Sequence, residues 1–327
     1  MRRALALLVV PLLAALAVAG CGSSSSSSSP AGADGSVTAT GAFGKAPAVT
    51  IPAQPAGTAL AVKTLIQGSG AVLTSSDAFV GNYVAYVWSG NTHKLATSTY
   101  TGSPALFSGK LLTGLQTALV GKKVGSRVLA VIPPAQAFGS AGNSQLGITG
   151  SDTLVFVIDV IQKFADTQGA SGTSVSSGGG VLPTVSAASG SAPAVTIPKS
   201  GTPPKQLVTK TLIKGTGPAV AKGQTVVVQY IGVIWPPKGG ANSGKVFDSS
   251  WSRSAPFGFT IGASPPQVIT GWDKGLVGQT VGSRVMLVVP PADGYGSAGA
   301  SQAGIKGTDT LVFVVDILGA YSPATAS

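Results

Sequence analysis

The sequence predicts an α+β protein built from two copies of one unit, each an antiparallel β-sheet packed against one short helix. Three observations predict this architecture. Residues 124–161 and 281–318 are identical at about two-thirds of their positions, so one unit is present twice. Both copies consist mainly of β-branched and aromatic runs bounded by Gly and Pro, a pattern typical of strands. Only 9% of the 327 residues are charged, which argues against coiled coils and helical bundles.

The two copies differ in length by ten residues. Their C-terminal segments repeat at an offset of 157, whereas KTLIQGSG at 63–70 and KTLIKGTG at 210–217 repeat at an offset of 147. A unit of about 110 residues is long enough to bury its own core. The domains expected are 58–164 and 205–322, joined by a Ser/Gly/Ala/Thr-rich linker over 165–204 and followed by a tail over 323–327.

Within the second copy, four apolar runs indicate strands and one segment indicates a helix. In the last run, Phe313, Val315 and Ile317 share one face, which predicts a strand that is buried on one side only. Val268–Val277 carries apolar residues close to helical spacing and is the single helix expected in this copy. The strands expected are 208–213, 225–235, 284–290 and 309–318.

The N-terminus carries the parts of an export signal. Two arginines precede an almost wholly apolar stretch over 4–19, which is shorter than the roughly 20 residues that a membrane-spanning helix needs. The sequence Val-Ala-Gly-Cys at 18–21 resembles the lipobox of bacterial lipoproteins. This resemblance implies a signal peptide over 1–20 and a lipid on Cys21 that anchors the protein to the cell membrane on its extracytoplasmic side. A plain secretory signal with a free thiol, and a short anchor, are the alternatives.

Residues 21–57 are rich in Ser, Gly, Ala and Pro and include an uninterrupted serine run over 23–29. Chains of this composition are flexible. We therefore predict a flexible tether between the lipid and the first domain.

Composition and motifs exclude several classes of function. The net charge is +11, but no run of Lys or Arg is longer than a pair, which argues against a nucleic-acid interface. One Cys and one His, His93, cannot build a disulfide framework or a multi-histidine metal centre. The sequence contains no GxSxG, HExxH or Walker A pattern. We expect no metal, cofactor or nucleotide site.

Five motifs of the second copy occur in a characteristic order over residues 205–321: VVVQYIG, KVFDSSWSRSAPF, VITGWDKGL, GYGSAG and TLVFVVDIL. Together they resemble the FKBP-type peptidyl-prolyl cis-trans isomerase domain. The resemblance implies two FKBP-like domains, each a twisted antiparallel sheet wrapped around one short helix. It also implies isomerase (rotamase) activity on proline-containing polypeptides, and inhibition by macrolides of the rapamycin type.

The resemblance assigns a pocket to the second copy. In such domains the tryptophan, here Trp272, forms the pocket floor, and the tyrosine of GYG, here Tyr295, offers its hydroxyl to a substrate carbonyl. Asp248 and Arg253 correspond to a hydrogen-bonding pair at the rim, while Gln267 replaces an acid common at that position. The implied catalytic residues are Tyr230, Phe247, Asp248, Trp272, Tyr295 and Phe313. The implied substrate-binding residues are Arg253, Phe257, Val268, Ile269 and Ile305.

The first copy departs from this pattern at the pocket while keeping its apolar strand positions. The differences are Ala96-Thr97 at the position of Phe247-Asp248, Leu115 at that of Trp272, and Phe138 at that of Tyr295. We expect a degenerate domain, weakly active or inactive.

These features predict a monomeric surface lipoprotein that assists the folding of extracytoplasmic proteins, with its C-terminal domain catalytic. A non-enzymatic chaperone or partner-binding lipoprotein is the alternative, and a mere spacer role for the first copy is another. Retention of Tyr230, Asp248, Trp272 and Tyr295 in one copy favours catalysis.

Overall fold

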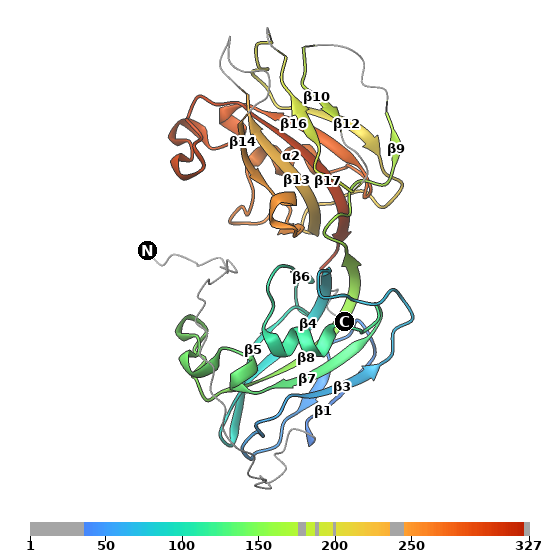
Figure 1. The fold of residues 1–327 in the computed structure, drawn as a ribbon, viewed down its shortest axis with the longest axis vertical. Helices are drawn as coiled ribbons and strands as arrows, with labels where there is room; N and C mark the ends of the chain where they lie inside the picture. The colour runs from blue at the N-terminus through green and yellow to red at the C-terminus, as the bar shows by residue number, and fades with distance from the viewer. Residues whose placement is uncertain (1–35, 176–180, 187–189, 199–200, 236–244, 324–327) are drawn as a thin grey trace, which may run out of the picture.

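The computed structural model of the chain describes residues 36–175, 181–186, 190–198, 201–235 and 245–323. The predicted signal peptide and Cys21 lie outside these residues. The described residues form two α+β domains that are stacked along the long axis of the molecule (Figure 1), so the predicted fold class is confirmed. Across the described ranges, no helix is both long enough and apolar enough to cross a bilayer.

The first domain is an antiparallel sheet with one helix. Its strand order is β3-β7-β8-β4-β5, and the short strand β6 pairs with β4. Helix α1 (Thr113–Leu119) packs on one face through Leu115, Ala118 and Leu119. The strands are β3 (Ala61–Ile66), β4 (Ala78–Ser89), β5 (Thr92–Ser98), β6 (Ala105–Phe107), β7 (Arg127–Ile132) and β8 (Thr153–Phe164).

The second domain repeats this plan. Its strand order is β14-β13-β17-β16-β12-β9, and β15 pairs with β13. Its strands are β9 (Thr173–Ser174), β12 (Val208–Lys214), β13 (Thr225–Ile234), β14 (Lys245–Ser249), β15 (Phe257–Thr260), β16 (Arg284–Val289) and β17 (Leu311–Tyr321). Short 3-10 turns, among them η5 (Trp251–Arg253) and η7 (Gly296–Ala298), form part of the loops around the sheet.

Helix α2 (Thr270–Leu276) is shorter than the segment expected from the sequence. Ile269 already has extended backbone angles (φ −65°, ψ 150°), as residues that precede a helix do. The helix stops because Val277 is extended and Gly278 takes a positive φ of 84°, which favours glycine. Val268 and Ile269 therefore approach the core from an extended segment rather than from a helix.

Two β-hairpins form an outer layer that the sequence did not predict. Strands β1 (Thr38–Thr40) and β2 (Ala48–Thr50) precede the first domain, and β10 (Thr184–Ser186) and β11 (Ala194–Thr196) precede the second. Each hairpin covers the sheet face opposite the helix. Ile197, for example, is 1% exposed and belongs to one apolar cluster with residues of β16 and β17.

This layer corrects two expectations. The composition of residues 21–57 predicts a flexible tether, yet Val37 and Ile51 are buried and the Trp88 indole donates to the carbonyl of Gln54 at 3.0 Å. The linker likewise supplies β9, β10 and β11. Strand β17 is consequently buried on both faces over most of its length, and the prediction of a half-buried strand was wrong.

Each sheet also contains a buried ion pair that the preceding segment closes over. Arg127 binds Asp159 through Nε at 2.6 Å and Nη2 at 2.7 Å, and the Gly44 amide donates to the same carboxylate at 2.7 Å. Arg284 and Asp316 repeat the bidentate pair at the same distances. The linker amide of Ala170 donates to Asp316 at 3.0 Å.

The covering role of the linker hairpin predicts the effect of truncating its anchor. Ile197→Ala should lower the free energy of unfolding by about 2–5 kcal/mol, because it leaves a cavity in a closed apolar layer. Val181→Ala in the same linker is the matched control, since Val181 is 65% exposed and a surface change costs less than about 0.5 kcal/mol. Urea unfolding followed by tryptophan fluorescence measures both. Equal effects of the two substitutions would contradict a packed hairpin.

Candidate functional site

The largest aromatic assembly of the molecule surrounds Trp272 at the start of α2. The Trp272 side chain is 4% exposed and meets the Tyr230 ring edge-on, with ring centroids 5.1 Å apart. Phe313 of β17 and Phe259 of β15 approach it at 5.3 and 5.5 Å, also edge-on. Such geometry is the favoured one for aromatic pairs. Four separate elements of the fold therefore build one apolar floor.

Further side chains surround the Trp272 cluster at the positions expected for the walls of the pocket. Phe257 of β15 lies 5.9 Å from the Tyr230 ring, and Phe247 of β14 lies 5.5 Å from that of Phe313. Val268 and Ile269 pack against the same cluster, and Ile305 is 4% exposed within it. The structure thus brings together the apolar residues that the sequence assigned to a pocket.

Polar groups lie at one rim. The Tyr230 hydroxyl donates to Asp248, and Arg253 donates to Asp248 and, at 2.8 Å, to the Tyr230 oxygen. The Arg253 guanidinium also lies 5.7 Å from the centre of the Tyr230 ring. Because the side chains of Asp248 and Arg253 are 38% and 47% exposed, the rim faces solvent while the floor does not.

Burial determines the ionisation of these groups. It raises the pKa of Tyr230 well above its ordinary value, and the hydrogen bond to Asp248 adds to this effect. Burial alone would lower the pKa of Arg253, but its hydrogen bond to Asp248 and the neighbouring Tyr230 raise it instead. Tyr295, which is 41% exposed, has a pKa raised by burial and by the charge of Asp248. The rim therefore offers neutral hydroxyl donors beside a charged guanidinium.

Some contacts that support the Trp272 cluster come from residues outside the predicted site. Beneath Tyr230, the Ser250 hydroxyl accepts from the Tyr230 amide at 2.7 Å and donates to Gln229. Gln267 accepts from the Thr260 amide at 2.8 Å, which ties the segment before α2 to β15. Phe259 is not among the pocket residues that the resemblance implies, although its ring lies 5.5 Å from that of Trp272. Its alternation with Phe257 along one strand was the available signal.

The first domain presents the same backbone with a different surface. Ala85 pairs with Thr97 as Gly232 pairs with Asp248, and α1 begins 157 residues before α2, so the sequence alignment of the two copies is confirmed. Leu115 occupies the place of Trp272 and is 5% exposed.

The ring packing of the first domain differs as well. Its aromatic rings pack against one another, and no indole lies at their centre. Phe107 lies parallel to Phe79 with ring centroids 4.6 Å apart, and Tyr83 meets Phe107 edge-on with centroids 5.3 Å apart. Position 97 carries a threonine where the second domain has the carboxylate of the rim.

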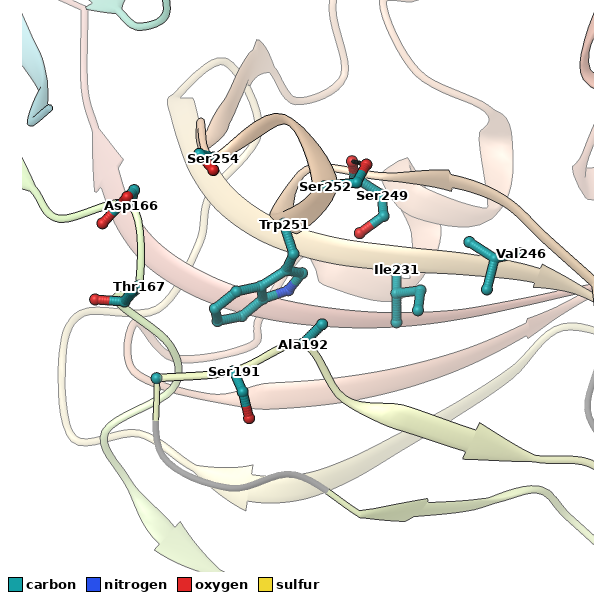
Figure 2. A pocket seen from close by; sticks show the side chains of 11 residues that line it. Asp166, Thr167, Ser191, Ala192, Ile231, Val246, Ser249, Trp251, Ser252 and Ser254 are labelled. Atoms are coloured by element: carbon teal, nitrogen blue, oxygen red, sulfur yellow. Dashed lines mark hydrogen bonds between the residues drawn. The ribbon is translucent and has the colours of Figure 1, made fainter.

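A cavity lies on the other face of the same sheet. This cavity of about 450 Å³ lies between η5 and the linker, and Figure 2 shows the Trp251 indole beside the linker residues Ser191 and Ala192. The Trp251 Nε1 atom is buried there without a hydrogen-bond partner among the described residues. Ile231 belongs to the outer apolar layer, so this cavity is separate from the pocket floor.

The chemistry open to the Trp272 pocket is non-covalent. Among the residues that the structure describes there, the polar groups are hydroxyls, one carboxylate and one guanidinium, without a histidine or cysteine. Among the described residues, no three His, Cys, Asp or Glu side chains form a group that could hold a metal ion. The cluster therefore offers an apolar surface with hydrogen-bonding groups at its rim, and its described residues include no nucleophile paired with a general base.

Comparison with known proteins gives matches in both domains. The sequence model of the family described as "FKBP-type peptidyl-prolyl cis-trans isomerase" matches residues 74–161 and 217–318. An "FK506-binding protein" of Streptomyces anulatus is 42% identical over 118 residues, covering 36% of this chain and 89% of the relative. "FK506-binding protein 2B" of Rhizopus delemar is 45% identical over 96 residues, covering 29% of this chain and 42% of that protein, so the match spans less than half of it. Among solved structures, FkpA from Escherichia coli aligns with a TM-score of 0.31 and 37% identity, covering 36% of this chain and 49% of that chain.

The raised pKa of Tyr230 predicts a pH effect on stability. A group whose pKa is higher in the folded state stabilises it fully below its unfolded pKa, here about 10, and loses that contribution as pH rises toward the folded pKa. The free energy of unfolding should therefore fall from about pH 10 upward, and less steeply in Tyr230→Phe than in the wild type. Urea unfolding between pH 8 and 11, with tyrosinate absorbance at 295 nm, measures this. Identical slopes for both proteins would contradict it.

Proposed function

Because the chain belongs to the FKBP-type peptidyl-prolyl cis-trans isomerase family, we propose that its second domain is the catalytic unit and its first domain a degenerate one. The proposal is carried by one observation: the indole floor and the rim of Tyr230, Asp248 and Arg253 occur together in the second domain only. The first domain has Leu115 and Thr97 at the two decisive positions. The proposed substrates of the second domain are proline-containing polypeptides.

The reaction requires rotation about an X–Pro bond and no bond to the enzyme. Twisting the amide removes its resonance, which gives a barrier of about 18–20 kcal/mol. The uncatalysed change takes about 10–100 s, so bringing it to about a millisecond requires a barrier lower by roughly 6 kcal/mol. The enzyme supplies this by binding the twisted amide more tightly than the planar one.

The pocket residues suit that task. The planar amide is more polar than the twisted amide, so the dry floor around Trp272 favours the twisted form of a bound proline. The exposed Tyr295 hydroxyl serves as a donor to a substrate carbonyl at the rim. Tyr230 and Arg253 fix the Asp248 carboxylate at the same rim. Gln267, already bonded to Thr260, replaces an acid common in the family and so changes contacts with a ligand's backbone.

Exchange of the floor residue tests which domain is catalytic. In the full chain, Trp272→Leu copies the first domain and should lower kcat/KM about 30- to 150-fold, since about 2–3 kcal/mol of contact with the proline ring is lost. Leu115→Val, the corresponding change in the first domain, should leave kcat/KM within twofold. A protease-coupled assay with an Ala-Leu-Pro-Phe peptide measures both, and circular dichroism verifies folding. Activity that survives Trp272→Leu but not Leu115→Val would assign catalysis to the other domain.

The family binds macrolides of the FK506 type, and we propose the Trp272 pocket as their site here. Ligand and substrate would compete for one apolar floor. The relatives named FK506-binding protein, together with the ring packing around Trp272, support this assignment.

We further propose that the protein is a monomeric lipoprotein, attached through Cys21 to the extracytoplasmic side of the cell membrane, where it assists folding of exported proteins. The support lies in the sequence: an apolar leader, Val-Ala-Gly-Cys at 18–21 and the serine run that follows. The structure begins at Ser36, where the chain enters the first hairpin.

Substitution of the single cysteine tests the anchor. Cys21→Ala should move the protein from the membrane fraction to the medium, because one thiol carries the whole attachment. Ser23→Ala, two residues away, should leave the protein in the membrane fraction. Cell fractionation followed by immunoblotting measures both. Retention of the Cys21→Ala protein in membranes would favour the uncleaved-anchor alternative.

A further inference from the structure

The two domains meet through an apolar cluster to which both contribute. From the first domain come Val80 of β4 and Phe164 at the end of β8, and from the second come Val227 of β13 and Tyr321 at the end of β17. The Phe164 and Tyr321 rings meet edge-on with centroids 6.5 Å apart. Figure 1 shows the ends of β8 and β17 facing each other at this junction.

The junction joins equivalent positions of the repeated unit. Val80 and Val227 are related by the offset of 147, and Phe164 and Tyr321 by the offset of 157. Two copies that pack through the same surface form a pseudo-twofold pair, as in a symmetric dimer. Positions at which the two domains contribute different residues to this contact therefore indicate how the role of one domain differs from that of the other.

One departure concerns the short edge strands. Leu106 of β6 is opposite Val80 in register, and Gly258 of β15 is opposite Val227, so the two residues occupy equivalent positions. A Cβ atom built on Gly258 would lie 2.9 Å from the Cβ and Cδ2 atoms of Leu106, closer than real contacts allow. The leucine of one domain thus fills the space left by the glycine of the other.

Two hydrogen bonds hold Leu106 in this place. The buried Thr225 hydroxyl donates to the Pro104 carbonyl at 2.9 Å, and the Ser103 hydroxyl donates to the Gly223 carbonyl at 3.4 Å. Both bonds join the loop before β6 to the chain at the start of β13. The loop before β6 is therefore part of the junction.

The contacted strand is also a wall of the catalytic pocket. Along β15, Phe257 and Phe259 point to the pocket face, where both rings approach Trp272, while Gly258 between them faces Leu106. Strand β15 is hydrogen-bonded to one strand, β13. Its outer face is covered by the first domain.

From this arrangement we infer that the first domain acts on the reaction of the second, with Leu106 as a positioning residue for substrate binding. Leu106 packs against Gly258 and so fixes the position of β15 relative to the rest of the pocket. That position sets the distance between the Phe257 ring and the proline ring of a bound substrate. The first domain thus supports one wall of the catalytic pocket. This inference rests on the proposed function of the second domain.

The test uses the full chain and four variants at the junction. Leu106→Ala should raise KM about fivefold and leave kcat within twofold, because a looser wall weakens binding of substrate and transition state alike. The dissociation constant for FK506, measured by tryptophan fluorescence, should rise by a similar factor. Gly258→Ala should also raise both constants, since its methyl group collides with Leu106. Leu106→Gly combined with Gly258→Ala should bring both constants back toward the wild type, because the glycine removes both Leu106 atoms that the new methyl group meets.

Phe164→Leu is the matched control, since it alters the same cluster away from β15 and should leave both constants unchanged. Thermal unfolding of each variant shows that the domains remain folded. The inference is overturned if Leu106→Ala leaves KM and FK506 affinity at wild-type values, if Phe164→Leu shifts them equally, or if the double variant is no better than the single ones. Trp272→Leu in the same assay separates this outcome from failure of the proposed function, because full activity of that variant would refute the catalytic assignment itself.

Discussion

The packing of aromatic rings around Trp272 is the interaction on which the rest of the second domain depends. The indole is held by rings from β13, β15 and β17, which come from distant parts of the chain. Each strand must keep its register for its ring to arrive, because a shift of one residue would turn the ring to the other face. A floor of this kind therefore exists only when the whole sheet has formed.

The outer layer explains how so small a sheet keeps that register. Strand β17 is buried on both faces because the linker hairpin covers one face and α2 the other. The buried pair of Arg284 and Asp316 joins β16 to β17 and receives a linker amide. A buried ion pair adds little to stability by itself, but leaving either partner alone is costly. We infer that the pair selects one arrangement of strands and linker, and the first domain repeats it with Arg127 and Asp159.

Divergence between the copies has followed two different constraints. The sheet positions and the ion pair are kept in both copies, since each domain needs them to fold. Of the pocket positions, the first copy keeps Tyr83, Ile148 and Phe156 in place of Tyr230, Ile305 and Phe313. It has Leu115 and Thr97 where the second copy has the indole and the carboxylate. At the junction the constraint is mutual, because Leu106 and Gly258 fit each other and two leucines there would collide. The pair is thus suited to contact between unlike copies.

The sequence by itself determined the duplication and the α+β class, and it named most of the residues that pack around Trp272. Strand runs and ordered motifs are local signals, and the equivalence of Leu115 with Trp272 follows from alignment alone. The tertiary structure decided what no local signal carries. Residues such as Val37 and Ile197 lie in stretches whose composition is typical of flexible linkers, and they are ordered because a distant sheet face would otherwise expose its apolar side chains to water. The contact of Leu106 with Gly258 likewise joins residues 152 positions apart, and only the packing of complete domains brings them together.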